Sequence, residues 1–94
     1  MDNNKQKYKL MFDIVRDELN KVDPMNLCPG SLAPIDEYEP ETTRIMAALK
    51  NVTNTIELSQ VVVKVFFIVL GEAFSENYFN SCAQNILDRI NELN

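Results

Sequence analysis

The strongest constraint on the fold is an apolar run of ten residues, 61–70, that only Lys64 interrupts. A helix needs about 20 apolar residues to span a bilayer, so this run is too short to be a membrane anchor. Polar side chains and a glycine flank it on both sides: Glu57, Ser59, Gln60, Gly71 and Glu72. The run therefore predicts a buried element of a folded domain, and we expect no membrane partner.

The flanking residues indicate that this element is a helix. The run is rich in valine, isoleucine and phenylalanine, so a β-strand is a serious alternative. A strand would leave Lys64 as the only polar residue on its face, whereas a helix gathers the polar positions on one narrow stripe. We predict a helix over about 56–74, with Thr55 as its N-cap. Because it is apolar nearly all round, it should be the central helix, and Ile68 falls within the stripe of polar positions: Glu57, Gln60, Lys64 and Gly71.

Two amphipathic segments lie near the ends of the chain. Residues 4–22 and 76–93 both repeat apolar side chains at helical steps, which is typical of a helix with one buried face. Asp23-Pro24 ends the first segment, because the residue before a proline avoids the helical region, and Ser75 is a suitable cap for the second. The apolar positions are Tyr8, Met11, Val15, Leu19 and Val22 in the first, and Phe79, Cys82, Ala83, Ile86, Leu87, Ile90 and Leu93 in the second.

A shorter helix should begin at Glu39-Pro40-Glu41. Proline suits the first turn of a helix, and the glutamates favour the positive end of its dipole. The expected buried face consists of Ile45, Met46, Leu49 and Val52. Four helices with two short connections predict a single all-α domain over residues 1–94, a four-helix, bundle-like fold with antiparallel neighbours.

Residues 23–38 form the expected long loop between the first two helices. They hold three of the four prolines of the chain, with turns predicted at Pro29-Gly30 and at Pro34. A flexible linker has no need for large apolar side chains, yet this loop has five, so we expect it to pack along the body of the domain. These side chains are Met25, Leu27, Leu32, Ile35 and Tyr38.

The negative charge of the chain is concentrated in one segment. The formal net charge is −5, and residues 23–41 contain five acidic and no basic residues: Asp23, Asp36, Glu37, Glu39 and Glu41. Such a surface repels a phosphate backbone and attracts a cationic one, so we expect a protein partner with a basic surface and no nucleic acid. A calcium site is less expected, because the loop lacks the Asp/Asn alternation and central glycine of an EF-hand.

The residues that are missing limit the chemistry. The chain has no histidine and no tryptophan, and its two cysteines, Cys28 and Cys82, show no metal-binding spacing. We therefore predict no enzyme activity, no catalytic residue, no metal and no cofactor. The polar N-terminus resembles no signal peptide, and two cysteines do not form a disulfide framework, so we expect a cytoplasmic protein with reduced thiols.

The candidate binding residues are Asp36, Glu37, Tyr38, Glu39 and Glu41. They form either an exposed docking face or only the capping of the second helix, and Tyr38 is either a contact residue or a staple of the loop. Asp23, Pro24 and Leu27 form a structural motif that stops the first helix and returns the chain to the core. A homodimer through the surface around Ile68 is the alternative function, and a small-ligand protein or an enzyme is a weaker one.

Two short motifs resemble a known family. Asp23-Pro24-Met25-Asn26-Leu27 and residues 36–41, Asp-Glu-Tyr-Glu-Pro-Glu, are similar to the Asp-Pro-x-x-Leu and Asp-Glu-Tyr-x-x-Glu elements of the YugE-like family of small bacterial proteins. The resemblance covers the whole chain. It implies an all-α bundle, a bacterial origin and no enzyme activity. A more distant analogy, to immunity partners of bacterial toxins, implies docking on a basic toxin surface.

Overall fold

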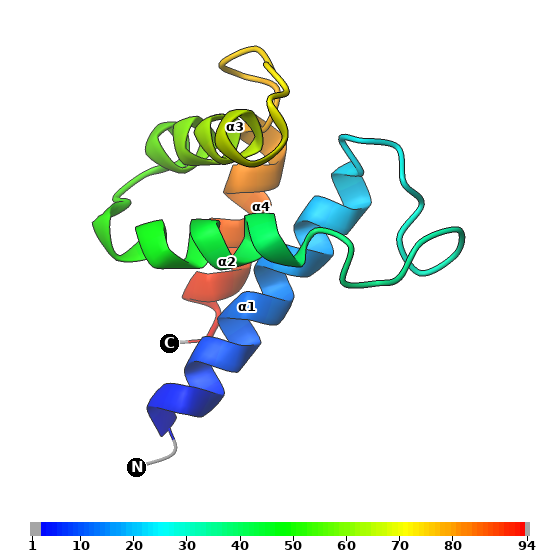
Figure 1. The fold of residues 1–94 in the computed structure, drawn as a ribbon. Coiled ribbons are helices and arrows are strands. Elements are labelled where there is room, and N and C mark those ends of the chain that lie inside the picture. Colours follow the sequence, from blue (N-terminus) through cyan, green and yellow to red (C-terminus); the bar gives the residue numbers. More distant parts are fainter. Residues whose placement is uncertain (1–2, 94) are drawn as a thin grey trace.

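The computed structural model of the protein describes residues 3–93 (Figure 1). Within these residues the chain forms helices and loops, which confirms the expected all-α class, and the only strand-type pairing is an isolated bridge between Pro29 and Ala33. No helix of this part of the chain combines the length and the hydrophobicity that crossing a bilayer requires. The helices are α1 (Asn3–Val22), α2 (Glu39–Ala48), the 3₁₀ helix η1 (Leu49–Asn51), α3 (Thr55–Leu70) and α4 (Asn80–Asn91).

The four α-helices enclose one core as a bundle-like ring. α2 and α4 each pack against both α1 and α3, whereas α1 and α3 barely touch. Figure 1 shows α2 running across α1 and α4 rather than alongside them. In the same view α3 lies above α2 and runs in the opposite direction. The antiparallel arrangement expected from a short connection is therefore seen for α2 and α3, whereas α1 and α2 cross.

The apolar helix α3 is not the central helix that its composition predicts. Leu58 and Phe66 are fully buried against α2 and α4, but Ile56, Phe67 and Ile68 are 66%, 58% and 52% exposed. In a ring of four, each helix buries only the stripe that faces its two neighbours. A helix that is apolar all round therefore leaves apolar side chains at the surface, and the exposure predicted for Ile68 is confirmed.

An aromatic cluster forms the centre of the core. The ring of Phe66 contacts those of Tyr38, Phe74 and Phe79, with centroid distances of 5.9, 5.8 and 5.3 Å. Cys82 is buried in the same core, as its position on the apolar face of the last helix predicts. Aromatic pairs at such distances add about 0.5–1.5 kcal/mol each to the free energy of burial.

A capping arrangement different from the predicted one starts α3. The N-cap is Asn54, whose Oδ1 accepts a hydrogen bond from the backbone N–H of Glu57 at 2.9 Å. The Glu57 carboxylate in turn accepts from the N–H and the hydroxyl of Thr53, at 2.7 and 2.8 Å. The predicted cap, Thr55, is instead the first helical residue and donates its hydroxyl proton to Gln84 of α4 at 2.6 Å.

The connection between α3 and α4 is longer than predicted. α3 ends at Leu70 because Gly71 adopts the left-handed conformation, with φ of 71°, that terminates many helices. α4 begins only at Asn80 and ends at Asn91, so the predicted bounds of 74 for the third helix and 76–93 for the fourth are wrong.

Aromatic packing explains why residues 71–79 leave the helical pattern. Phe74 and Phe79 both reach Phe66, and their own rings lie 5.2 Å apart, which anchors the segment to the core from both ends. Ser75 does not cap α4, because its hydroxyl donates to the side-chain oxygen of Asn77 at 3.3 Å.

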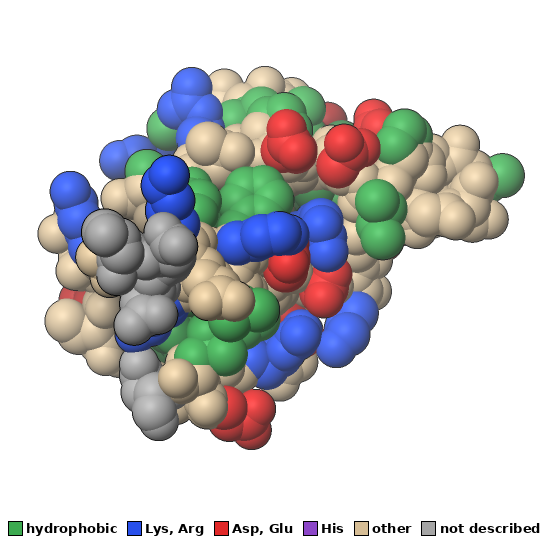
Figure 2. Space-filling model, turned by 90° about the horizontal axis from the view of Figure 1, so that it is seen from below, with side chains coloured by type: hydrophobic (Ala, Val, Ile, Leu, Met, Phe, Trp, Pro, Cys, Tyr) green, Lys and Arg blue, Asp and Glu red, His purple; other side chains and the backbone are tan. Residues whose placement is uncertain are grey.

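Ion pairs join α1 to α4. Glu18 is 2% exposed, and its Oε2 accepts hydrogen bonds from Lys21 Nζ and Arg89 Nη1, both at 3.0 Å. Arg89 also lies 3.7 Å from the Asp17 carboxylate. Burial alone would raise the pKa of Glu18, but the hydrogen bonds from Lys21 and Arg89 outweigh it and leave that pKa below its usual value. The face seen in Figure 2 accordingly shows acidic and basic side chains intermixed.

Candidate functional site

The long loop is organised by one carboxylate. Oδ1 of Asp23 accepts hydrogen bonds from the Tyr38 hydroxyl at 2.7 Å and from the Leu27 N–H at 2.8 Å, and Oδ2 accepts from the Cys28 N–H at 3.0 Å. The hydroxyl of Tyr38 also accepts from the Met25 N–H at 3.0 Å. Asp23 thus joins both ends of the loop, and the hydrogen bond from Tyr38 lowers the pKa of its carboxyl.

These hydrogen bonds hold a backbone that would otherwise be unfavourable. Asp23, Asn26 and Cys28 all have positive φ values, of 49°, 57° and 54°. The left-handed conformation costs roughly 1–2 kcal/mol for a residue with a side chain, somewhat less for asparagine and aspartate. The carboxylate of Asp23 offsets this cost by accepting from the N–H groups of Leu27 and Cys28, and the backbone hydrogen bond from the Asn26 N–H to the Asp23 carbonyl adds to it.

Tyr38 and Glu41 are buried, which corrects the predicted set of contact residues. Tyr38 is 1% exposed and packs on Phe66, so it is a staple of the loop and not a contact on its surface. Glu41 is 3% exposed, and its Oε1 has no hydrogen-bond partner. Burial, with a smaller contribution from the nearby Glu37, raises the pKa of Glu41. A partner protein reaches neither side chain.

The second half of the loop, residues 29–35, extends away from the body of the domain. The carbonyl of Cys28 accepts from the N–H groups of Ser31, Leu32 and Ala33 at 3.0–3.2 Å, which closes a tight tip. Leu32 is 85% exposed and Ile35 is 55% exposed, although Asn20 of α1 donates to the Ile35 carbonyl at 2.9 Å. The structure therefore contradicts our expectation that the whole loop packs along the domain, and Figures 1 and 2 show it extending to the right.

The partially buried half of the loop follows the expectation. Met25 and Leu27 pack against the core. Their position next to the Asp23 hydrogen bonds explains the difference, since those bonds draw residues 25–28 inward. Beyond Cys28 the chain makes its hydrogen bonds mainly within the tip and leaves the core.

Three exposed carboxylates lie at the base of this extension. Asp36, Glu37 and Glu39 are all exposed, and none forms an ion pair with a described lysine or arginine. By contrast, the acidic residues in the middle of α1, Asp13, Asp17 and Glu18, form ion pairs with neighbouring lysine and arginine side chains. We call this surface the docking loop: Leu32, Ile35, Asp36, Glu37 and Glu39.

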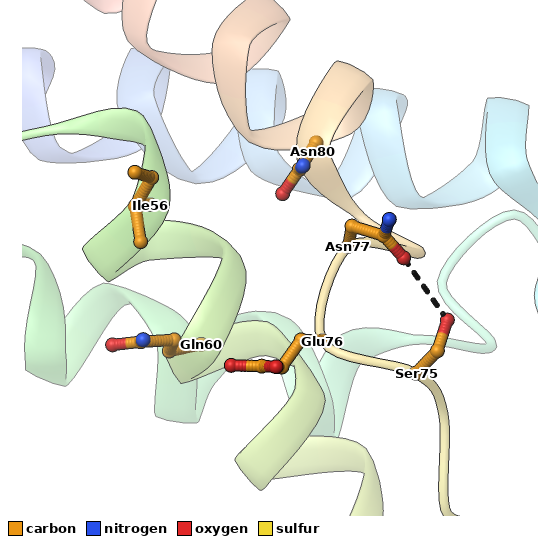
Figure 3. Close-up of a pocket in the computed structure, with 6 residues that line it drawn as sticks. All are labelled: Ile56, Gln60, Ser75, Glu76, Asn77 and Asn80. Carbon is orange, nitrogen blue, oxygen red and sulfur yellow. Dashed lines mark hydrogen bonds between the residues drawn. The ribbon is translucent and has the colours of Figure 1, made fainter.

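Figure 3 shows a hollow between α3 and the 71–79 connection, with a volume of about 390 Å³. Ile56 and Gln60 line it from α3, and the other lining residues are Ser75, Glu76, Asn77 and Asn80. Its polar groups are mainly amides, with one carboxylate. It is open to solvent and contains none of the candidate binding residues predicted from the sequence.

The cysteines and carboxylates supply no clustered chemistry in the described part of the chain. Cys82 is buried, and burial raises the pKa of its thiol to about 12, while Cys28 is half-buried in the loop. Among residues 3–93 there is no group of three cysteine, aspartate or glutamate side chains that could hold a metal ion.

Sequence reasoning missed Leu32 and Ile35 as exposed residues. The available signal was the pair of turns around Pro29-Gly30 and Pro34, which leaves the intervening apolar side chains at a loop tip. Comparison with protein families, curated proteins and solved structures finds no match to this chain. The resemblance to the YugE-like family stays a prediction.

Proposed function

We propose that the chain is a non-enzymatic protein-binding module that docks on a basic protein surface through the docking loop. The observation that carries the proposal is the combination of two exposed apolar side chains on an extended loop, Leu32 and Ile35, with three unpaired carboxylates at its base. A loop with only acids would serve solubility equally well, and a loop with only apolar residues would be an aggregation hazard.

The two kinds of residue have separate roles in this proposal. Leu32 and Ile35 supply apolar area that a partner can bury, which is the main source of affinity. Asp36, Glu37 and Glu39 steer the encounter and select a cationic partner. The hydrogen bonds of Asp23 hold the loop in place before binding, which reduces the conformational entropy lost in the complex.

The partner in this proposal is a protein with an apolar depression surrounded by lysine and arginine. A bacterial toxin with a basic surface has this chemistry, in agreement with the analogy to immunity proteins. We further propose a cytoplasmic location, because the two cysteines are unbridged and a reducing compartment keeps them so.

Site-specific photo-crosslinking tests the proposal. A photo-reactive amino acid at position 32 should capture a basic protein in the cells that produce the chain. The matched control is the same amino acid at position 56, because Ile56 is similarly exposed but lies on α3. Capture with equal yield at position 56 would exclude a loop-specific interaction.

The captured protein is then purified and its affinity measured. Binding should weaken by a factor of ten or more when salt is raised from about 50 to about 500 mM, because the carboxylates are exposed to screening. The variant with Asp36→Lys, Glu37→Lys and Glu39→Lys should bind at least ten times more weakly, whereas Glu72→Lys, a single change at another exposed acid, should bind like the wild type. An affinity insensitive to both salt and charge reversal would refute the electrostatic role of the loop.

A further inference from the structure

A second surface of opposite charge lies on another side of α2. A groove of about 300 Å³ runs between α2 and α3, and its floor is apolar: Ala47, Ala48, Val61, Val65 and Ile68. Ile68 is 52% exposed, and Phe67 beside it is 58% exposed. The helices that form the groove meet through side chains deeper in the core, so this apolar surface is not covered by any described part of the chain.

Two cations border the groove. Arg44 of α2 and Lys64 of α3 are exposed and line it, and no ion pair or hydrogen bond occupies either side chain. The two other arginines of the chain, Arg16 and Arg89, behave differently, since both form ion pairs with carboxylates of α1. The lining of the groove contains no acid. In a chain with net charge −5, two unpaired cations beside an apolar floor are a local reversal of charge.

This charge pattern disfavours a second copy of the chain as the occupant. A symmetric dimer would place the patch on itself, so Arg44 and Lys64 would meet the same two cations of the partner copy. Like charges brought together at an interface cost free energy, and the groove offers no carboxylate to compensate them. An occupant with its own carboxylates has the opposite effect.

We infer that the groove between α2 and α3 binds an amphipathic helix of a partner protein that has an apolar stripe flanked by acidic residues. The apolar stripe fills the floor formed by the alanines and valines of the two helices, in the manner of helix-in-groove recognition. The flanking carboxylates pair with Arg44 and Lys64. The small side chains of Ala47 and Ala48 allow a helix to approach closely. This surface is separate from the docking loop, and the inference does not depend on the loop.

Synthetic peptides test this inference. The probe is an acetylated, amidated helical peptide of about 14 residues with leucines at i, i+3, i+4 and i+7 and glutamates beside them. A second peptide replaces the glutamates by lysines, and a third replaces the leucines by glutamines. We expect only the first to bind, with amide chemical-shift changes in an NMR titration confined to the groove, at Val61, Val65 and Ile68.

Charge exchange gives the sharpest result. Lys64→Glu should weaken binding of the acidic peptide about tenfold, whereas Lys5→Glu, the same change at an exposed lysine of α1, should leave the affinity within about twofold. The double variant Arg44→Glu with Lys64→Glu should bind the lysine peptide better than the acidic one. Neither residue is in the core, so both variants should fold.

Three results of the peptide experiments would overturn the inference. The acidic peptide could fail to bind the wild type, or bind Lys64→Glu and wild type equally, or perturb amides outside the groove. Sedimentation provides the remaining check, because a dimer of the wild-type chain that Ile68→Lys dissociates would identify a second copy as the occupant instead.

Discussion

Replacing Tyr38 by phenylalanine removes one hydroxyl from the buried staple and leaves the ring in place. The hydroxyl donates to the Asp23 carboxylate at 2.7 Å and accepts from the Met25 N–H at 3.0 Å. A hydrogen bond to a charged group contributes about 1.5–3 kcal/mol, and a partly buried N–H left unpaired adds roughly 1 kcal/mol to the loss. The packing of the ring on Phe66, at 5.9 Å, is retained. Because the Asp23 carboxylate is only partly buried, the lower part of the range applies to its hydrogen bond. We therefore expect Tyr38→Phe to lower the free energy of unfolding by about 2.5–3 kcal/mol.

This loss is a large fraction of the stability of a small domain. A chain of 94 residues is stabilised by roughly 5–14 kcal/mol, and 1 kcal/mol shifts the melting temperature by about 4–8 °C. Tyr38→Phe should therefore melt about 10–20 °C below the wild type in a thermal scan followed by circular dichroism. Urea titration gives the free energy directly. The control is Tyr78→Phe, because the Tyr78 ring is 47% exposed and its hydroxyl makes no hydrogen bond.

A double-mutant cycle with Asp23 separates the hydrogen bond from other effects. Asp23→Asn keeps a residue that tolerates the left-handed conformation, so the backbone need not change. If the hydroxyl acts through this carboxylate, the two substitutions together should cost less than the sum of the single ones, by about 1–2 kcal/mol. A Tyr38→Phe variant as stable as Tyr78→Phe, or additive effects in the cycle, would refute the idea that Asp23 and Tyr38 hold the loop.

Three other substitutions test the energetics of particular residues. Glu41→Gln should stabilise the fold by roughly 1 kcal/mol at pH 7, because the raised pKa of Glu41 means that its charge opposes folding. Urea titrations from pH 7 to pH 4 should show this gain disappearing as the wild-type carboxyl becomes protonated. Arg89→Met should cost about 1–2 kcal/mol of unfolding free energy at pH 7, since Lys21 alone then neutralises the buried Glu18. The lowered pKa of Glu18 contributes stability that is lost as the pH falls through that pKa, so the cost of the substitution should be smaller at acidic pH. Gly71→Ala should cost about 1 kcal/mol in the same assay through its φ of 71°, as no atom lies within 4 Å of an added Cβ and steric overlap is excluded.

The helices were predictable because their signals are local. Apolar side chains at steps of three and four, Asp23-Pro24 at the end of α1 and Glu39-Pro40 at the start of α2 all act within a few residues of where they occur. The start of α2 at Glu39 and the end of α1 at Val22 follow the sequence to the residue. Asn54 and Thr55 are both suitable N-cap residues for α3. The side-chain geometry decides which of the two caps the helix, and the sequence alone does not reveal that geometry.

Most of the other wrong predictions involve contacts outside the local helical pattern. Phe74 looked like a helical residue but packs on Phe66 from a connection. α3 appeared central because its composition is apolar all round, yet the ring of helices covers only one side of it. Tyr38 was open to two interpretations, and only its hydrogen bond to Asp23, fifteen residues earlier, decides between them. Such pairs need the tertiary fold, which periodicity does not encode.

The position of α2 explains how one small chain can present two surfaces of opposite sign. Its first residue, Glu39, continues the acidic docking loop, whereas Arg44 points to the groove shared with α3. Its inner face is fixed by buried Thr42 and Ile45, so neither outer surface can shift without disturbing the core. At separations near 10 Å, salt at physiological strength screens exposed charges from one another. The acids of the loop and the cations of the groove can therefore act on different partners, and charge reversal at one surface should leave binding at the other unchanged.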